Sequence, residues 1–400
     1  MKNNLENSSR KTNECQTPVM SLILCSRNDQ YQGNSRWRLE TALNYVAQKV
    51  EELNRGTQVE VIVADWGSQV GLHEMIRLSP AAAKMVKFLH VSSDVAKSLQ
   101  KDSPFPEVLA LNAAARRAAG EYVGRIDQDT LVGKKFLKTF FDLYEKSQLL
   151  VPLESALLLS NRRRIPYRFA KRCPSFFGVE RYIRWFNKVL PLMEPPPPHL
   201  YYQCYIGIWL LHKKLWADCG GYDERFIYMD NQEKDMILRL VNKYQFVNLG
   251  ELVDHDFYHL DHGSPLEPWS ASRNRKCNPE RDSDHLPDQF NPNGENWGLV
   301  QYELKLQPTQ VVCQEPDSLG VACVNRCGFL LHLGISLVQS LGDHIFILIA
   351  VKPYHKYKNF LSVWKHRVKV IVNAFNNEPV LKWPGVCINL CFKRISRIRT

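Results

Sequence analysis

Two carboxylates stand one residue apart where an apolar run of the chain ends. Asp127 and Asp129 follow Glu121–Ile126, whose composition predicts a β-strand. If the backbone turns after that strand, both carboxylates can face one divalent cation, and hard oxygen ligands suit Mg²⁺ or Mn²⁺. Such a cation neutralises a diphosphate. The same pair of residues is also typical of solvated turns, so its meaning depends on the elements around it.

Histidines alternate with acids in a second candidate site. His259 and His262 lie three residues apart within Asp254–Gly263, with Asp261 between them. Imidazole and carboxylate groups are common metal ligands. This density of ligating side chains indicates a metal site that takes one or both histidines.

An acid-rich segment follows the turn Gly220–Phe226 and forms the start of an expected helix. Acids at a helix N-terminus are favoured by the helix dipole and by capping, which explains most such clusters. The alternative is that one of Asp230, Glu233 and Asp235 acts as a general base on a hydroxyl.

Apolar strands alternate with amphipathic helices through the first half of the chain. The expected strands are Ser21–Cys25, Val59–Ala64, Val86–Val91 and Glu121–Ile126. The expected helices carry an apolar stripe from Leu39 to Leu53 and cover about Pro106 to Ala119. This alternation predicts the α/β class, with a mostly parallel sheet covered by helices on both faces.

Ligands of such sheets bind beyond the carboxyl ends of the strands. We therefore expect the chemistry at Ser26–Asp29, at Asp65–Ser68 and directly after Ile126.

The regular alternation ends after about residue 155. The basic, aromatic segment Arg162–Lys188 either closes over phosphates, holds an anionic acceptor or forms a solvated charged helix. Pro195–Pro198 is an expected stiff spacer. A strand is expected over Cys204–Leu211 and a helix over Gln232–Lys243, before a polar surface loop over 263–296.

The composition is that of a globular protein. The chain has 400 residues, 44% of them hydrophobic and 23% charged, which excludes wholesale disorder. The net charge of +11 indicates anionic partners. This charge is uneven, because eleven Lys and Arg residues from Lys352 onward face the single acid Glu378, and nine over 161–190 face Glu180.

The remaining features concern the cell compartment. The eleven scattered cysteines lack CxxC pairs, which favours reduced cytosolic thiols over a disulfide framework. The polar segment Met1–Pro18 predicts no secretory signal. The apolar stretch Gly328–Val351 is interrupted by Asp343, so it predicts a buried helix and a strand rather than a transmembrane span.

Four motifs occur in an order that is specific, although each alone is weak. They are Ser26-Arg-Asn, Asp65-Trp-Gly-Ser, the segment Leu111–Asp129 and Gly220–Phe226. With this order the chain resembles family 2-like glycosyltransferases of the GT-A fold over roughly residues 18–300. The loop Asn291–Leu299 is also similar to one in some relatives.

The resemblance implies a domain plan. It comprises a disordered N-terminus (1–17), a GT-A domain (18–300) and a basic C-terminal extension (301–400). Within the domain, the nucleotide is expected on residues 18–130 and the acceptor on 131–300.

The resemblance also implies metal-dependent transfer of a sugar from a nucleotide-sugar, UDP-linked by family habit, usually with inversion. Asp65 would hydrogen-bond the base, Asp127 would meet the ribose and the metal, and Asp129 would bind Mn²⁺ or Mg²⁺. His262 or His259 would complete the metal shell. The residues expected to bind the nucleotide-sugar are Ser26, Arg27, Asn28, Asp65, Arg116 and Asp127.

The position of the base departs from the family pattern. Relatives place Glu-Asp at the start of the helix after the glycine turn, and alignment on Arg239-Leu240 puts Gln232-Glu233 there. We therefore expect Glu233 to be the base, with Asp230 and Asp235 as rivals.

Two other classes remain open. The segment His259–His262 is similar to part of the metallo-β-lactamase motif, although Phe257 stands where that motif has its first histidine. The altered base pair also allows a non-catalytic binding protein with a membrane- or RNA-docking tail.

For the transferase we expect a cytoplasmic protein of glycan biosynthesis that acts on a carbohydrate or glycolipid. Peripheral contact of its basic tail with an anionic membrane is a hypothesis. Nucleic acid is not an expected partner of this transferase.

Overall fold

The structure is a computed structural model. It describes residues 17–29, 31–146, 149, 151–165, 167–189, 207–228, 230–241, 243–253, 256–262, 276–279 and 289–313. Described residues up to Gly178 and from Gly207 form one compact unit, and residues 179–189 belong to a second. The polyproline spacer, most of the expected N-terminal and C-terminal segments and the stretch Gly328–Val351 lie outside the described residues.

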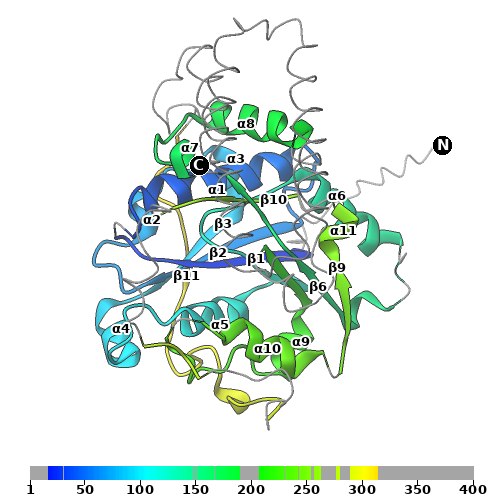
Figure 1. Cartoon of the computed structure of the whole chain (residues 1–400). Coiled ribbons are helices and arrows are strands. Elements are labelled where there is room, and N and C mark those ends of the chain that lie inside the picture. Colours follow the sequence, from blue (N-terminus) through cyan, green and yellow to red (C-terminus); the bar gives the residue numbers. More distant parts are fainter. Residues whose placement is uncertain are drawn as a thin grey trace, which may run out of the picture. The chain divides into compact units, whose positions relative to one another are not determined.

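The main sheet has eight strands in the order β11-β3-β2-β1-β4-β8-β6-β9 (Figure 1). Their bounds are β1 Met20–Ser26, β2 Val59–Trp66, β3 Val86–Val91, β4 Tyr122–Arg125, β6 Ala156–Ser160, β8 Ile208–His212, β9 Gln245–Asn248 and β11 Leu306–Pro308. Strands β8 and β11 run antiparallel to their neighbours, and all other pairs are parallel. This confirms a mixed α/β fold with a mostly parallel sheet.

Helices lie on both faces of this sheet (Figure 1). One face packs on α1 (Ser35–Glu51), α2 (Leu72–Met75), α3 (Pro80–Met85), α6 (Lys134–Lys146) and α11 (Leu249–Val253). The other packs on α4 (Ser93–Gln100), α5 (Glu107–Arg117), α9 (Lys213–Asp218) and α10 (Gln232–Leu240). Short helix α7 (Tyr167–Ala170) precedes α8 (Phe176–Val189).

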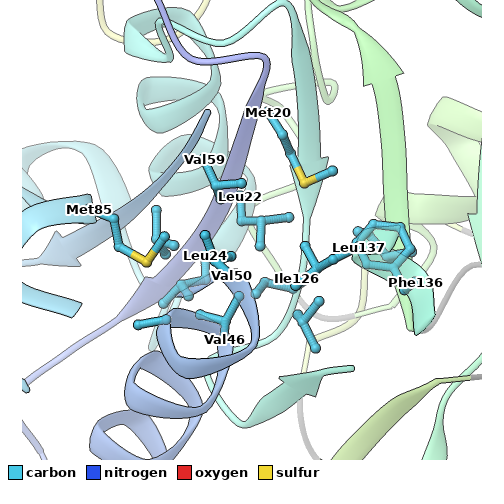
Figure 2. Packing of buried hydrophobic residues seen from close by; sticks show 14 of the residues in the cluster. Met20, Leu22, Leu24, Val46, Val50, Val59, Met85, Ile126, Phe136 and Leu137 are labelled. Carbon is cyan, nitrogen blue, oxygen red and sulfur yellow. The ribbon is translucent and has the colours of Figure 1, made fainter. Parts of the chain in front are cut away.

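The alternation of side chains along β1 divides the core into these two layers. Leu22 and Leu24 point toward Val46 and Val50 of α1, as Figure 2 shows, and Ile23 packs in the opposite layer. All five side chains are buried. Full burial of each such residue contributes about 1.5–3 kcal/mol, so the sheet that positions the strand ends is firmly anchored.

A smaller sheet has three strands, in the order β5-β10-β7. They are β5 (Thr130–Val132), β10 (Phe257–Leu260) and β7 (Arg163–Ile165). Strand β10 lies in the middle, where His259 is opposite Thr130 on one side and Arg164 on the other. This sheet therefore joins three parts of the chain that are far apart in sequence.

The four expected strands of the first half are confirmed to within two residues at each end. Strand β6 was not expected, although it runs parallel to β1 and ends at the same edge of the sheet. The boundary expected at residue 300 falls before β11, which pairs with β3 in the main sheet.

Two further findings concern the described residues only. No helix among them combines the length and the apolar character needed to cross a membrane. The cysteines among them are free thiols: Cys25, Cys173, Cys219, Cys277 and Cys313.

Candidate active site

The loops after β1, β2 and β4 meet at the carboxyl edge of the main sheet. The Ser26 hydroxyl donates to Gln128 Oε1 at 2.5 Å, and the Asn28 N–H donates to Ser68 Oγ at 2.8 Å. Since the three strands are parallel, these contacts place the three predicted loops side by side. A pocket opens beyond Ser26, between this loop and the helices α1 and α2.

Asp129, His259 and His262 form the one group of potential metal ligands that the described part of the chain contains. One ligand atom from each lies within 4.8 Å of the others. Asp129 Oδ1 is 2.8 Å from His259 Nδ1, and Asp129 Oδ2 is 3.4 Å from His262 Nε2. Asp129 directly precedes β5, and the pairing of β5 with β10 brings it next to His259.

The chemistry of this group fits a cation. Asp129 Oδ1 and His259 Nδ1 are buried, and neither makes a hydrogen bond although they lie 2.8 Å apart. Two lone-pair atoms so placed are suited to a shared third partner, and oxygen with nitrogen donors suits Mn²⁺ among other metals. Burial lowers the pKa of His262 to about 4, so its imidazole is neutral at pH 7.

Arg38 on α1 fixes the Asp129 carboxylate from the other side. Its side chain is fully buried, and Nη1 donates to Asp129 Oδ2 at 2.5 Å. Nη2 donates to the carbonyl oxygens of Tyr31 at 2.7 Å and Gly33 at 3.3 Å. Burial opposes the charge on Asp129, but His259, His262 and Arg38 outweigh it and hold the pKa of this carboxyl below its usual range.

Asp127 lies outside the group of metal ligands. Its Oδ1 is 2.8 Å from Arg125 Nη2, and its Oδ2 pairs with Arg162 Nη1. Both oxygens of the carboxylate therefore face guanidinium groups. The structure does not bring Asp127 to the three ligands that were expected to share a metal with it.

Glu233 lies next to these arginines, in the first turn of α10. Arg125 Nη2 is 3.2 Å from Glu233 Oε1 and 2.7 Å from Glu107 Oε1. Burial, helped by Glu107, raises the pKa of Glu233 to about 6, although Arg125 opposes this rise. A carboxylate with such a pKa is ionised at pH 7 and is a better proton acceptor than an ordinary glutamate.

The two rival acids have different surroundings. Asp235 and Arg239 form a fully buried ion pair at 3.0 Å. Arg239 also donates to the carbonyl oxygens of Cys219 and Gly221, so this pair holds the glycine turn. Asp230 is exposed and has a left-handed backbone, with φ of 65°. Of the three acids, only Glu233 contacts the buried arginine at the strand ends.

Asp65 is completely buried at the end of β2. It accepts the Leu72 N–H at 2.8 Å, contacts His90 Nδ1 at 3.0 Å and receives the Ser68 hydroxyl. The hydrogen bond between His90 and Asp65 raises the pKa of His90. Asp65 thus organises the loop beside the pocket, and its predicted contact with a base remains a prediction.

Arg27, another expected nucleotide ligand, lies at the same edge, where Nε contacts Asp29 Oδ2 at 2.8 Å.

Arg116 lies elsewhere. It is nine residues after Glu107 on α5, about 14 Å along the helix axis. Arg116 Nη1 donates to the carbonyl oxygens of Glu295 at 2.8 Å and Trp297 at 3.1 Å. The structure therefore does not bring Arg116 to the strand ends.

Two residues of the site, Arg38 and Glu107, were not predicted from the sequence, and Arg162 was named only as the start of a basic segment that could close over phosphates. A signal existed for Arg162, because it follows an apolar run, Ala156–Ser160, that ends like the strands before it. Arg38 and Glu107 lie within helices whose polar residues gave no such signal.

No protein-family model matches the chain, and no curated protein matches its sequence. Among solved structures, the catalytic domain of Drosophila beta1,4galactosyltransferase 7 in complex with xylobiose matches at 10% identity and a TM-score of 0.34, over 66% of this chain and 77% of that chain. S. aureus TarS 1-349 in complex with UDP matches at 16% identity and a TM-score of 0.37, over 60% of either chain.

A mutant of the Drosophila enzyme in complex with manganese, UDP-Gal and xylobiose matches at 9% identity and a TM-score of 0.33, over 66% of this chain and 83% of that chain. The chain spans less than two thirds of TarS 1-349. At these TM-scores and identities, the likenesses establish neither a family nor an activity for the chain.

Proposed function

We propose that the chain is a metal-dependent glycosyltransferase that moves a sugar from a nucleotide-diphosphate sugar to an acceptor hydroxyl. One observation carries this proposal: a group of side chains that could hold a cation and a buried carboxylate with a raised pKa both adjoin the carboxyl end of β4. Sugar transfer from a diphosphate needs both, one for the departing charge and one for the acceptor proton.

The donor would lie over the loops after β1, β2 and β4. In this proposal Asp129, His259 and His262 hold Mn²⁺ or Mg²⁺, which supplies positive charge to the departing diphosphate when bound. In this proposal the nucleoside lies against the loop of Ser26 and Asn28, which line the adjoining pocket. Uridine is the first choice because of the sequence resemblance.

Glu233 would remove the proton from the acceptor hydroxyl as the hydroxyl attacks the anomeric carbon. A base on the opposite side of that carbon from the diphosphate gives inversion. Arg125 would hold Glu233 in place through the contact at 3.2 Å and keep it ionised before the acceptor binds.

Donor hydrolysis tests this function without knowledge of the acceptor. The purified chain is incubated with nucleotide-sugars, including UDP-Gal and UDP-GlcNAc, in the presence of Mn²⁺ or EDTA, and free nucleoside diphosphate is measured. We expect metal-dependent release from one donor and loss of release in Asp129→Ala. Lys138→Ala, an exposed change on α6, is the control and should leave release unchanged.

No release, together with no binding of donor or Mn²⁺ by calorimetry, would contradict the proposal. That result would favour a protein that binds its partner without catalysis.

A further inference from the structure

We propose that Arg162 is an exchangeable counter-ion: it pairs with Asp127 in the free chain, moves to the diphosphate when a nucleotide binds, and so releases Asp127. This inference rests on the proposed function and adds an order of events to it. It concerns one residue of the basic segment Arg162–Lys188, and assigns that residue a second partner, Asp127.

The starting point is that Asp127 is blocked by its neighbours. Asp127 and Asp129 are two residues apart, yet only Asp129 belongs to the group of metal ligands. The two oxygens of Asp127 face two different cations, Arg125 and Arg162. An added cation can use this carboxylate only if one of the two arginines moves away.

Arg162 is the arginine that can move. Arg125 is almost fully buried and is also paired with Glu107 at 2.7 Å and Glu233 at 3.2 Å. Arg162 lies in the connection between β6 and β7, and its side chain is 16% exposed. Among the described residues, moving Arg162 would therefore break its one ion pair, with Asp127, whereas moving Arg125 would break three ion pairs.

Arg162 has both positive and negative neighbours. Burial and the charges of Arg125 and Arg164 lower its pKa to about 9, while Asp261 and Glu107 oppose this fall, so the guanidinium is charged at pH 7. Arg162 directly precedes β7, which pairs with the strand β10 that carries His259, and it contacts Asp127, two residues from Asp129. A diphosphate bound beside that group would meet the Arg162 guanidinium, and planar guanidinium groups suit phosphate oxygens.

The exchange makes nucleotide and cation help each other to bind. Without nucleotide, a cation competes with Arg162 for Asp127. With nucleotide, Arg162 turns to the diphosphate and the carboxylate is free. Coupling of this kind typically changes affinity by about 5- to 150-fold.

Two binding measurements test the exchange, because they should respond to one mutation with opposite signs. In Arg162→Met, calorimetry should show Mn²⁺ alone binding about tenfold more tightly, since its competitor is gone. UDP in EDTA should bind about tenfold more weakly, since a charged phosphate contact is lost. GDP, ADP, CDP and dTDP are measured in parallel, and the tightest ligand of the wild type replaces UDP if it differs.

Arg55→Met is the matched control. Arg55 lies between α1 and β2, at the opposite edge of the sheet from these strand ends, and pairs with Glu145 at 2.6 Å, so the same loss of charge should change neither affinity. In Arg162→Met/Asp127→Asn the gain in Mn²⁺ affinity should disappear. Arg162→Lys keeps the charge and serves if Arg162→Met does not fold by circular dichroism; its changes should have the same signs and be smaller.

A fall in both affinities, or no change in either, would overturn the exchange while leaving the proposed function intact. If the wild type binds no nucleoside diphosphate even with Mn²⁺, the proposed function itself fails and the exchange fails with it.

Discussion

Glu233→Gln should make the protein more stable and abolish its activity. The carboxylate is mostly buried, and burial raises its pKa from 4.5 to about 6. A shift of this size corresponds to about 2 kcal/mol of lost stability at pH 7.5, where the group is charged. The amide removes that cost, which already includes the attraction to Arg125, and the poorer fit of an amide beside the guanidinium costs about 1 kcal/mol. Arg125 keeps Glu107 and Asp127 as partners, so no buried charge is left alone.

The net gain of about 1 kcal/mol should raise the melting temperature by about 2–4 °C in a domain of this size. The gain depends on pH in a defined direction. A carboxyl whose pKa is raised in the folded state lowers stability as pH rises from 4.5 to 6, so the advantage of Glu233→Gln should shrink as pH falls through that range. Donor hydrolysis should fall by about 10²- to 10⁴-fold, as expected for loss of a general base.

Asp235→Asn is the comparison that makes this prediction decisive. It leaves Arg239 buried without its partner, so it should cost about 3–5 kcal/mol and lower the melting temperature strongly. Thermal unfolding and donor hydrolysis are measured for both variants. A Glu233→Gln protein that is less stable at pH 7.5 would refute the cost of burying this carboxylate. Full activity of Glu233→Gln, with a folded but inactive Asp235→Asn protein, would refute the assignment of the base.

Three further outcomes follow from the structure. Gly221→Ala should destabilise the chain by more than Gly33→Ala in urea unfolding, because both have φ of 68° but only the Cβ at Gly221 would meet a side-chain oxygen at 2.3 Å. His90→Gln should lower the melting temperature more at pH 5.5 than at pH 8.5, because its bond to Asp65 raises the pKa of His90 and the added stability is lost as pH rises through that pKa. His262→Gln should weaken Mn²⁺ binding in calorimetry by at least tenfold, and should lower the melting temperature less than Asp235→Asn because loss of a neutral imidazole leaves no buried charge unpaired.

The parts of the fold that sequence could predict are those with local signals. Each of β1 to β4 is a short apolar run bounded by polar residues, and period and composition suffice to find it. Strand β6 has the same kind of signal over Ala156–Ser160, but it precedes a basic segment that masks the pattern. Strand β5 is three residues long and exists because β10 pairs with it from about 130 residues away.

The candidate site shows the same limit. Asp129 and Glu233 are recognisable from their place after a strand and at a helix start. The partners that set their charge are not, because Arg38 and Glu107 are single polar residues on helices, and nothing local says which side chain a helix turns toward a buried carboxylate. Local sequence propensity predicts the helices and strands, but contacts between residues far apart in the sequence determine which charged side chains lie together.

The small sheet has a consequence for how errors in folding are detected. Side chains of neighbouring residues in a strand point to opposite faces, so a slip of β10 against β5 by one residue would turn His259 away and offer Tyr258 or Leu260 to Asp129. Neither could take part in a cation site of this kind, since one is apolar and the other carries its phenol far from the backbone. Cation affinity thus reports on a single hydrogen bond pattern, and a chain that pairs these strands wrongly would be folded in outline and yet unable to bind metal.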